Sequence, residues 1–175
     1  LLRAVKALPF FGVHAACVLA FFVPFSWWLV ALAVGLYYLR MFGLTTGYHR
    51  YFSHRSFKTS RVFQFALAWL GAMCVQKGVL WWAANHRAHH RFSDTEHDLH
   101  SPAVRSFLWA HVGWFLHTAY ERTDWDRIRD FSKSPEIRWL DRNYLVPPLT
   151  MFFFLTLFFG IPGLVWGGFI STTIL

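Results

Sequence analysis

Two apolar runs near the start of the chain are separated by a short uncharged turn. The first covers residues 7–23 and the second covers residues 27–46, and Pro24-Phe25-Ser26 lies between them. Proline and serine are typical turn residues. A helix needs about 20 residues to cross the ~30 Å hydrocarbon core of a bilayer. We therefore predict a transmembrane hairpin, with Trp27 and Trp28 at the far interface, where indole rings are favoured.

Two more apolar runs lie at the other end of the chain. Residues 144–160 have the length of a third span, and residues 164–175 begin a fourth. Ile161-Pro162-Gly163 between them predicts a turn. The pattern therefore indicates two transmembrane hairpins on either side of a more polar block at residues 47–142.

The apolar stretch 62–80 inside this block is ambiguous. By hydropathy it is long enough to span a membrane, but Arg61, Gln64, Gln76 and Lys77 suit a helix that lies at the interface. A single crossing would also place the histidines on its two sides in opposite compartments. We favour an interfacial or re-entrant segment over a span.

Composition agrees with a membrane protein. The 175 residues are 55% hydrophobic and include 20 Phe and 10 Trp, too apolar and aromatic for an ordinary soluble domain. The net charge of +8 raises the question of nucleic acid, but its distribution argues against such a partner. All nine acidic residues lie between Asp94 and Asp141, and outside residues 40–142 the only charged side chains are Arg3 and Lys6. This pattern fits a membrane-attached block rather than a DNA-binding face.

The positive-inside rule gives the expected orientation. Arg3, Lys6 and the basic block that begins at Arg40 lie at the same end of the predicted hairpin, so we place them in the cytoplasm. The chain begins at Leu1 without methionine and stops at Leu175 inside an apolar run. We therefore expect it to be part of a longer protein.

Histidines are concentrated between Trp81 and Ser101, where five occur in 21 residues. His86, His89 and His90 stand at i, i+3 and i+4, which places them on one face of a helix. Imidazole is a good ligand for zinc, copper, iron and nickel. A metal site is therefore the first hypothesis, ahead of a solvated helix that carries several histidines by chance.

A second histidine pair lies in the segment GYHRYFSHRSFK. His49 and His54 are five residues apart, which is a rotation of about 140° on a regular α-helix. Such a spacing does not give one narrow face. The pair could serve two metals, or one metal if the helix is broken nearby.

The two histidine segments together resemble a known family. GYHRYFSHRSF followed by NHRAHHRFSD, after a transmembrane hairpin, is similar to the first and second histidine boxes of membrane fatty-acid desaturases. Within that superfamily the sequence most resembles the stearoyl-CoA desaturase type, the Δ9 acyl-CoA or acyl-lipid desaturases. His111-Val112-Gly113-Trp114 resembles the HVGW element of that family, and the resemblance covers roughly residues 10–175.

This resemblance implies an all-α integral membrane fold with four spans, the last incomplete here, under a cytoplasmic cap that holds the histidine boxes. It implies a multi-pass protein of the bacterial inner membrane or the endoplasmic reticulum. The implied cofactor is a non-haem di-iron centre that uses O₂. The implied partners are membrane lipids, a long-chain acyl-CoA, acyl-lipid or acyl-carrier substrate, and an electron donor such as cytochrome b5 or a ferredoxin.

By position, the implied metal ligands are His49, His54, His86, His89 and His90. The product would be an acyl chain with a cis double bond. The third histidine box of the family is not present in these 175 residues. We therefore expect the chain to be inactive alone and the full-length protein to be active.

Other residues near the boxes are candidates for supporting roles. We expect neighbours of the metal ligands among Asp94, His97, His100 and His111, with Asp94 and Glu96 able to orient imidazoles by accepting their second N–H. Trp81, Trp82 and Trp109 are candidates to line an acyl-chain path, although interfacial aromatics would look the same. Asn85 and Leu99 depart from the acyl-CoA desaturase pattern, so the acyl carrier stays open.

Three alternatives remain at this stage. Histidine suits zinc as well as iron, so a hydrolytic zinc site is compatible with the ligand types. A membrane di-iron hydroxylase would share the histidine boxes but insert oxygen. A non-catalytic haem protein would need paired histidines inside spans, and only His14 lies well inside one; we expect His14 to be a packing or snorkelling residue.

Overall fold

The computed structural model describes the backbone of residues 2–175 and the side chains of residue 8 and residues 10–175. Within this range all regular secondary structure is helical, with no β-strand, and turns and loops join the helices. The all-α prediction is therefore confirmed. The side chains of Arg3 and Lys6, which entered the expected orientation, lie outside the described residues.

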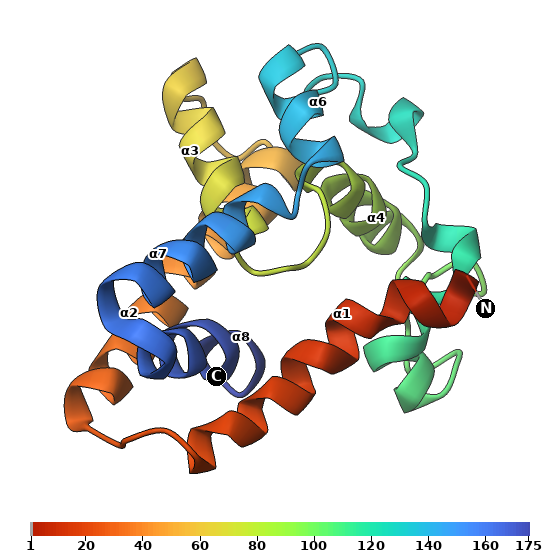
Figure 1. Cartoon of the computed structure of the whole chain (residues 1–175). Coiled ribbons are helices and arrows are strands. Elements are labelled where there is room, and N and C mark those ends of the chain that lie inside the picture. The colour runs from red at the N-terminus through yellow and green to blue at the C-terminus, as the bar shows by residue number, and fades with distance from the viewer. Residues whose placement is uncertain (1) are drawn as a thin grey trace.

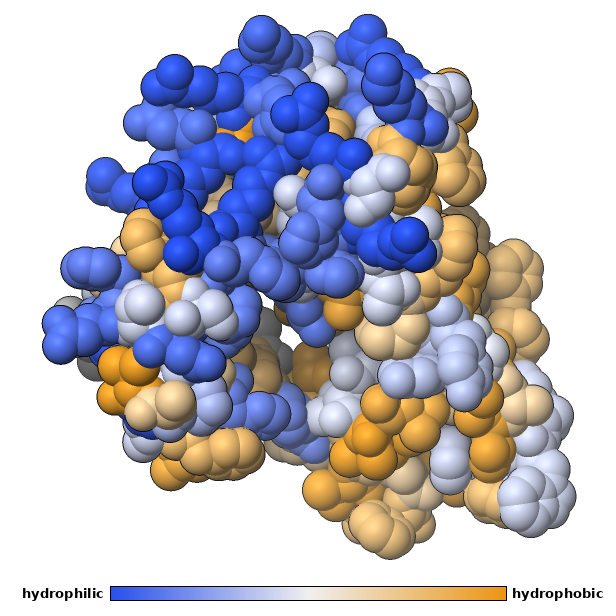
Figure 2. Space-filling view, turned by 180° about the vertical axis from the view of Figure 1, so that it is seen from behind, coloured by the Kyte–Doolittle hydropathy of each residue, from blue (hydrophilic) through white to orange (hydrophobic). Residues whose placement is uncertain are grey.

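The helices form two groups (Figure 1). One contains α2 (Trp27–Phe42), α7 (Val146–Gly163), the π-helix η6 (Leu164–Ile170) and α8 (Ser171–Thr173). The other contains α3 (Arg61–Ala72), α4 (Val79–Phe92) and α6 (Pro135–Arg142), which lie at the top of the view. Hydrophilic side chains gather at the end of the molecule that holds α3, α4 and α6, and hydrophobic side chains cover much of the opposite end (Figure 2).

The N-terminal helix runs along one side of the molecule. It consists of α1 (Leu2–Ala16) and the 3₁₀ turn η1 (Cys17–Phe21). Its apolar part, Phe10–Phe21, is shorter than a membrane span, and it leaves large side chains exposed, such as Phe21 and Val18. The ring of Phe10 lies 5.5 Å from the ring of Phe115, so the helix touches the short α5 (Trp114–Leu116) of the polar half.

The helix that contains the second apolar run continues well past residue 46, where that run was predicted to end. Helix α2 passes directly into the π-helix η2 (Gly43–Ser53), and together they form a helix of 27 residues, roughly 40 Å long. Within the described part of the chain, this is one of two helices long and apolar enough to cross a membrane, and the other is Val146–Thr173. The surplus length carries the first histidine pair into the polar half.

A backbone break divides the second long helix. Gly160 has φ 64° and ψ −165°, a conformation that glycine adopts without steric cost. The chain turns there, and η6 packs back against α7 with the rings of Phe152 and Phe169 5.6 Å apart. The turn therefore lies at the start of the predicted Ile161-Pro162-Gly163 segment, and residues 146–173 form two packed helical segments rather than one rod.

The ambiguous stretch 62–80 forms a short helix and a loop. Helix α3 ends after 12 residues at Ala72, and the chain reaches α4 at Val79. Gly43 and Gly47 of η2 face α3 so closely that a Cβ atom would lie 2.5 Å from Leu70 or 2.9 Å from the Leu67 carbonyl. This segment is too short to cross a bilayer, and it fixes η2 beside α4.

The polar half is completed by short turns. These are η3 (Trp109–Gly113), η4 (Thr118–Tyr120) and η5 (Trp125–Ile128), which lead to α6. The core of the polar half is formed by side chains from five elements: Tyr48, Phe52, Leu67, Leu80, Ala84, Ile128, Ile137 and Leu140. This core holds η2, α3, α4, η5 and α6 together as one packed unit.

Candidate metal centre

Helix α4 is anchored at its first turn by a carboxylate from another helix. Asp141 of α6 accepts hydrogen bonds from the backbone N–H groups of Leu80 (2.7 Å) and Trp81 (3.1 Å). These N–H groups have no partner within the helix itself. A Cβ atom at Gly78 would lie 2.2 Å from the Asp141 carboxylate oxygen, so glycine is required for this approach.

The first histidine pair shares a face because η2 is a π-helix. In a π-helix the backbone bonds join residues i and i+5. The His54 N–H donates to the His49 carbonyl at 3.1 Å, and the Nε2 atoms of the two rings are 3.0 Å apart. The 140° expected for an α-helix does not apply, and the pair points at one place.

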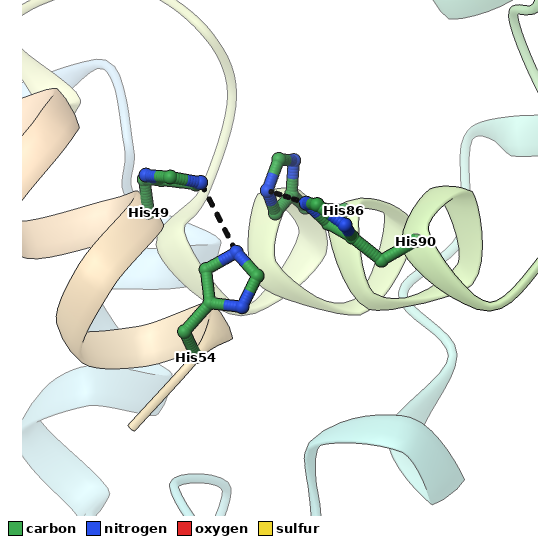
Figure 3. Close-up of side chains that lie close together, drawn as sticks. All are labelled: His49, His54, His86 and His90. Atoms are coloured by element: carbon green, nitrogen blue, oxygen red, sulfur yellow. Dashed lines mark hydrogen bonds between the residues drawn. The ribbon is translucent and has the colours of Figure 1, made fainter. Parts of the chain in front are cut away.

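The second pair comes from α4 in ordinary α-helical geometry. His86 and His90 are one turn apart, and their Nε2 atoms are also 3.0 Å apart. The two pairs face each other across a small space (Figure 3). One ring nitrogen from each of His49, His54, His86 and His90 lies within 4.8 Å of the others.

In this cluster the imidazoles of His86 and His54 have a lowered pKa, which disfavours their protonated form. Burial and the neighbouring imidazoles lower the pKa of His86 to about 3, and burial lowers the pKa of His54 as well. A neutral imidazole has a free lone pair for a metal, so no proton has to be displaced from His86 near pH 7.

A tryptophan fixes the plane of one of these rings. Trp82 stacks on His86 with centroids 4.6 Å apart and planes 19° apart. The Trp82 indole N–H donates to the Gln76 side chain at 3.1 Å, which holds the indole in place. Trp82, predicted to line an acyl path, therefore lies directly against the histidine cluster.

His89 belongs to a second, adjacent group. Its Nδ1 atom lies 2.9 Å from a carboxylate oxygen of Asp98, and its ring stacks on His100 at 4.3 Å. Burial opposes ionisation of Asp98, but hydrogen bonds from His89 and from the Asp94 and His100 N–H groups outweigh it and lower the pKa of Asp98. A carboxylate that accepts from Nδ1 selects the tautomer whose Nε2 is free to bind a metal.

The other residues proposed as neighbours of the ligands lie in different settings. The carboxylate that orients an imidazole is Asp98, whereas Asp94 accepts a hydrogen bond from the Ser101 hydroxyl at 2.5 Å. Glu96 and His97 are exposed, and the His97 ring meets Phe92 edge to face. His111 stacks on Phe107 at 5.6 Å.

The remaining candidate tryptophans brace the polar half. Trp81 stacks on Trp114 and donates to the Tyr120 carbonyl at 2.7 Å, and Trp109 donates to the Leu99 carbonyl at 3.1 Å. An apolar cavity of about 370 Å³ lies elsewhere, between α2, α3 and α7. Among the residues that line it are Leu36, Trp69, Met73, Met151, Phe154 and Phe158. His14, in α1, is exposed and contacts the Phe10 carbonyl one turn away.

The donor set fits a metal ion. Two nitrogens that each bind a metal at about 2.1 Å lie about 3.0 Å apart when the bonds form a right angle, and about 3.4 Å apart in a tetrahedron. The 3.0 Å separations within both pairs match the first value. Four imidazoles arranged in this way could hold one ion, with further coordination positions left for other ligands.

Comparison with known proteins identifies the family. The profile described as "Fatty acid desaturase" matches residues 7–175, which is nearly the whole chain. The chain belongs to the fatty acid desaturase family. The two histidine segments that meet in the structure are consistent with the histidine boxes of this family.

Three desaturase-family relatives illustrate the range of similar proteins. The chain is 34% identical to an acyl-CoA 5-desaturase from Anemone leveillei and covers 49% of its length; the alignment covers 89% of the chain. It is 34% identical to a hex-5-enoyl-[acyl-carrier protein] acetylenase from Moorena producens (94% of the chain, 57% of the relative). It is 32% identical to an sn-1 stearoyl-lipid 9-desaturase from Anabaena variabilis (94% of the chain, 61% of the relative). The chain thus spans about half to three-fifths of the length of these desaturase-family proteins.

Several residues that organise the histidine site were missed from the sequence. Asp98, Arg87, Asp130 and Asp141 all support the histidine segments through hydrogen bonds. Asp98 and Arg87 lie within or beside the histidine stretch, so their position was a usable signal. Asp130 and Asp141 lie more than 40 residues from the residues of α4 that they contact, and no local pattern marks them.

Proposed function

We propose that the full-length protein is a membrane fatty-acid desaturase that introduces a cis double bond into a long-chain acyl group. The observation that carries this proposal is the convergence of four imidazole nitrogens from η2 and α4 within 4.8 Å. Family membership supports the reaction class. The proposed reaction removes two hydrogens from adjacent methylene groups and, with O₂, two electrons and two protons, yields two water molecules.

We assign the first metal position to His49, His54, His86 and His90. His89 is assigned to a second position, because Asp98 engages its Nδ1 and leaves Nε2 for coordination. Ligands from outside this chain would complete that position. A bound non-haem di-iron centre would supply an oxidant strong enough to take hydrogen from an unactivated methylene, which no side chain can do.

Residues of this chain orient the proposed metal ligands and line part of the proposed acyl-chain path. Trp82 fixes the His86 ring, and Asp98 fixes the tautomer of His89. The apolar cavity between α2, α3 and α7 is our candidate for part of the acyl-chain path, because its lining is aliphatic and aromatic. It replaces Trp81 and Trp109 in that assignment, since their indoles are engaged with backbone carbonyls.

The acyl carrier and the electron donor stay open. The names of these relatives refer to acyl-CoA, acyl-lipid and acyl-carrier-protein substrates. We propose a long-chain acyl substrate in one of these three forms, and a small one-electron carrier such as cytochrome b5 or a ferredoxin as the partner. The orientation we propose places η2, α4 and α6 on the cytoplasmic side of a bacterial inner membrane or the endoplasmic reticulum.

Expression of the full-length protein in a desaturase-deficient host tests the reaction. Mass spectrometry of the total fatty acids should show a new cis-monounsaturated species, which is absent when a His86→Ala variant is expressed to the same level. Hydroxylated fatty acids would instead establish the hydroxylase alternative. Unchanged lipids from well-expressed, iron-loaded protein would contradict the proposal, and zinc without iron in the purified protein would favour the hydrolytic one.

A further inference from the structure

We propose that Arg87 is the positioning residue that holds the two histidine segments at the separation one metal ion requires. This inference rests on the proposed metal centre and goes beyond it, because Arg87 contributes no ligand. Arg87 directly follows His86 on α4, and its side chain reaches the end of η2, beside His54.

Every N–H group of the guanidinium has an acceptor. Nε donates to the Ser53 carbonyl (3.0 Å) and Nη2 donates to the Phe52 carbonyl (2.6 Å). The remaining three N–H groups donate to the Arg127 carbonyl (2.6 Å) and to the two carboxylate oxygens of Asp130 (3.1 and 2.9 Å). Five donors meet five acceptors, which is the full capacity of an arginine.

The carbonyls of Phe52 and Ser53 lie at the end of η2, where a helix leaves its carbonyl groups without backbone partners. Phe52 and Ser53 are the last two residues of η2, and the final carbonyls of a helix have no N–H group ahead of them. A cation at this end is favoured by the helix dipole. Arg87 therefore caps η2 from α4, and the cap joins the helix that carries His49 and His54 to the helix that carries His86 and His90.

Asp130 sets the direction of this cap. Its carboxylate meets the guanidinium edge-on through both oxygens, and the two side chains are each 22% exposed. A bidentate pair fixes the plane of the guanidinium as well as its position. The ion pair thus orients the other three donors toward the carbonyls of Phe52, Ser53 and Arg127.

Lysine cannot reproduce this arrangement. Its ammonium group has three donors that point in tetrahedral directions, whereas arginine presents five in one plane. An Arg87→Lys variant keeps the charge and most of the apolar stem but loses the fixed geometry. It is therefore a probe of position rather than of charge.

The matched control is Arg91, one turn further along the same helix. Arg91 is exposed, and its guanidinium lies 5.4 Å from the ring of Phe92. Arg91→Lys makes the same chemical change on the same helix and keeps the charge, without touching η2.

The test compares metal affinity in the purified full-length protein. Apo protein is titrated with Co²⁺, which reports its ligand field by absorption, and unfolding of the apo protein is followed separately. We expect Arg87→Lys to weaken Co²⁺ binding by about 10- to 100-fold, the range found when groups that orient ligands are changed, and to alter the absorption band. Arg91→Lys should bind as the wild type does.

Asp130→Ala keeps the test decisive if Arg87→Lys does not fold. This variant leaves the three carbonyl contacts of Arg87 but removes the pair that orients them, so we expect a smaller loss of affinity in folded protein. Wild-type affinity in folded Arg87→Lys, or in Asp130→Ala when Arg87→Lys is unfolded, overturns the inference. A wild-type protein that binds no metal would instead overturn the proposed function.

Discussion

The apolar half and the polar half of this protein are each stabilised by different kinds of internal contact. Around α2, α7 and α8 the helices pack through aliphatic and aromatic surfaces, and large side chains such as Trp27 and Phe158 remain exposed. Around η2, α4 and α6 an apolar core is supplemented by charged hydrogen bonds directed at helix ends. Apolar packing tolerates small shifts, whereas a metal ligand must be placed within about half an ångström. The second kind of contact is found where the metal centre requires it.

Arg40 shows the contrast most clearly, because it brings a charge into the apolar half. It is 2% exposed, and it donates to the Leu36 carbonyl and to oxygens of Ser171 and Thr172 in α8. Its acceptors are carbonyl and hydroxyl groups, whereas Arg87 has a carboxylate among its acceptors. Arg40 ties α2 to α8, and Arg87 ties α4 to η2.

The largest effect should follow from removing a ligand of the four-histidine group. We expect His86→Ala in the full-length protein to abolish desaturation and to lower its iron content, because the group loses its most buried imidazole. Iron analysis and fatty-acid profiling of the same preparation measure both. The matched control is His97→Ala, whose ring is exposed at the edge of Phe92 and should keep wild-type iron and activity. Equal iron content in His86→Ala and wild type would remove His86 from the ligand set.

The next largest effect should come from the carboxylate beside His89. Asp98→Asn can no longer require an N–H on Nδ1 of His89, so the tautomer that leaves Nε2 free is less favoured. We expect metal affinity of the second position to fall by about 10- to 100-fold, measured by competition with a chelator. Asp94→Asn is the control, because its side chain bonds a serine hydroxyl instead of an imidazole. If both variants lose metal equally, the effect belongs to the loop and not to His89.

A smaller effect is expected in the apolar half. Ser171→Ala removes an acceptor from buried Arg40 and should cost about 1–3 kcal/mol of unfolding free energy, because a buried donor is left unsatisfied. Arg40→Met removes the charge, while Ser171 keeps its bond to the Ala33 carbonyl and Thr172 keeps its bond to Gly168, so it should cost less. Thermal unfolding of both variants in detergent tests the order. A reversed order would show that the arginine itself stabilises the helix pair.

The smallest effect concerns the surface pair between α3 and α6. Hydrogen bonds from Arg61 lower the pKa of Glu136 to about 2, from the ordinary value of 4.5. Because the folded-state pKa is the lower one, the stabilisation is present above pH 4.5 and is lost as the pH falls toward 2. We expect Glu136→Gln to lower the unfolding temperature slightly at pH 7, and the difference from wild type to shrink below pH 4.5. A difference that is independent of pH would exclude the ion pair as its cause.

The sequence alone predicted the chemistry of the site better than its geometry. Four of the five predicted ligands meet in one group, and the fifth, His89, points to Asp98 and His100. The i, i+3, i+4 pattern correctly placed three histidines on one helix, but it did not distinguish His86 and His90 from His89. That distinction depends on what each ring meets beyond the helix, which no spacing encodes.

The five-residue spacing of His49 and His54 had left two solutions open. Sequence periodicity assumes a regular α-helix, and the π-helical backbone of η2 changes that assumption. This π-helix packs closely against α3 at Gly43 and Gly47 and receives hydrogen bonds from Arg87 at its last carbonyls. These are contacts between segments distant in the chain, so local propensity could not reveal them.

The sequence by itself determined the helical class, the apolar runs, the turn near Gly160 and the presence of two histidine clusters in the polar half. Hydropathy and ligand chemistry are properties of the residues themselves, and they survive without knowledge of the fold. The tertiary structure alone decided which imidazoles share a site, which carboxylate orients them and which arginine joins their helices. Those outcomes require atoms from separate segments to lie within about 3 Å of each other, and only the folded chain brings them together.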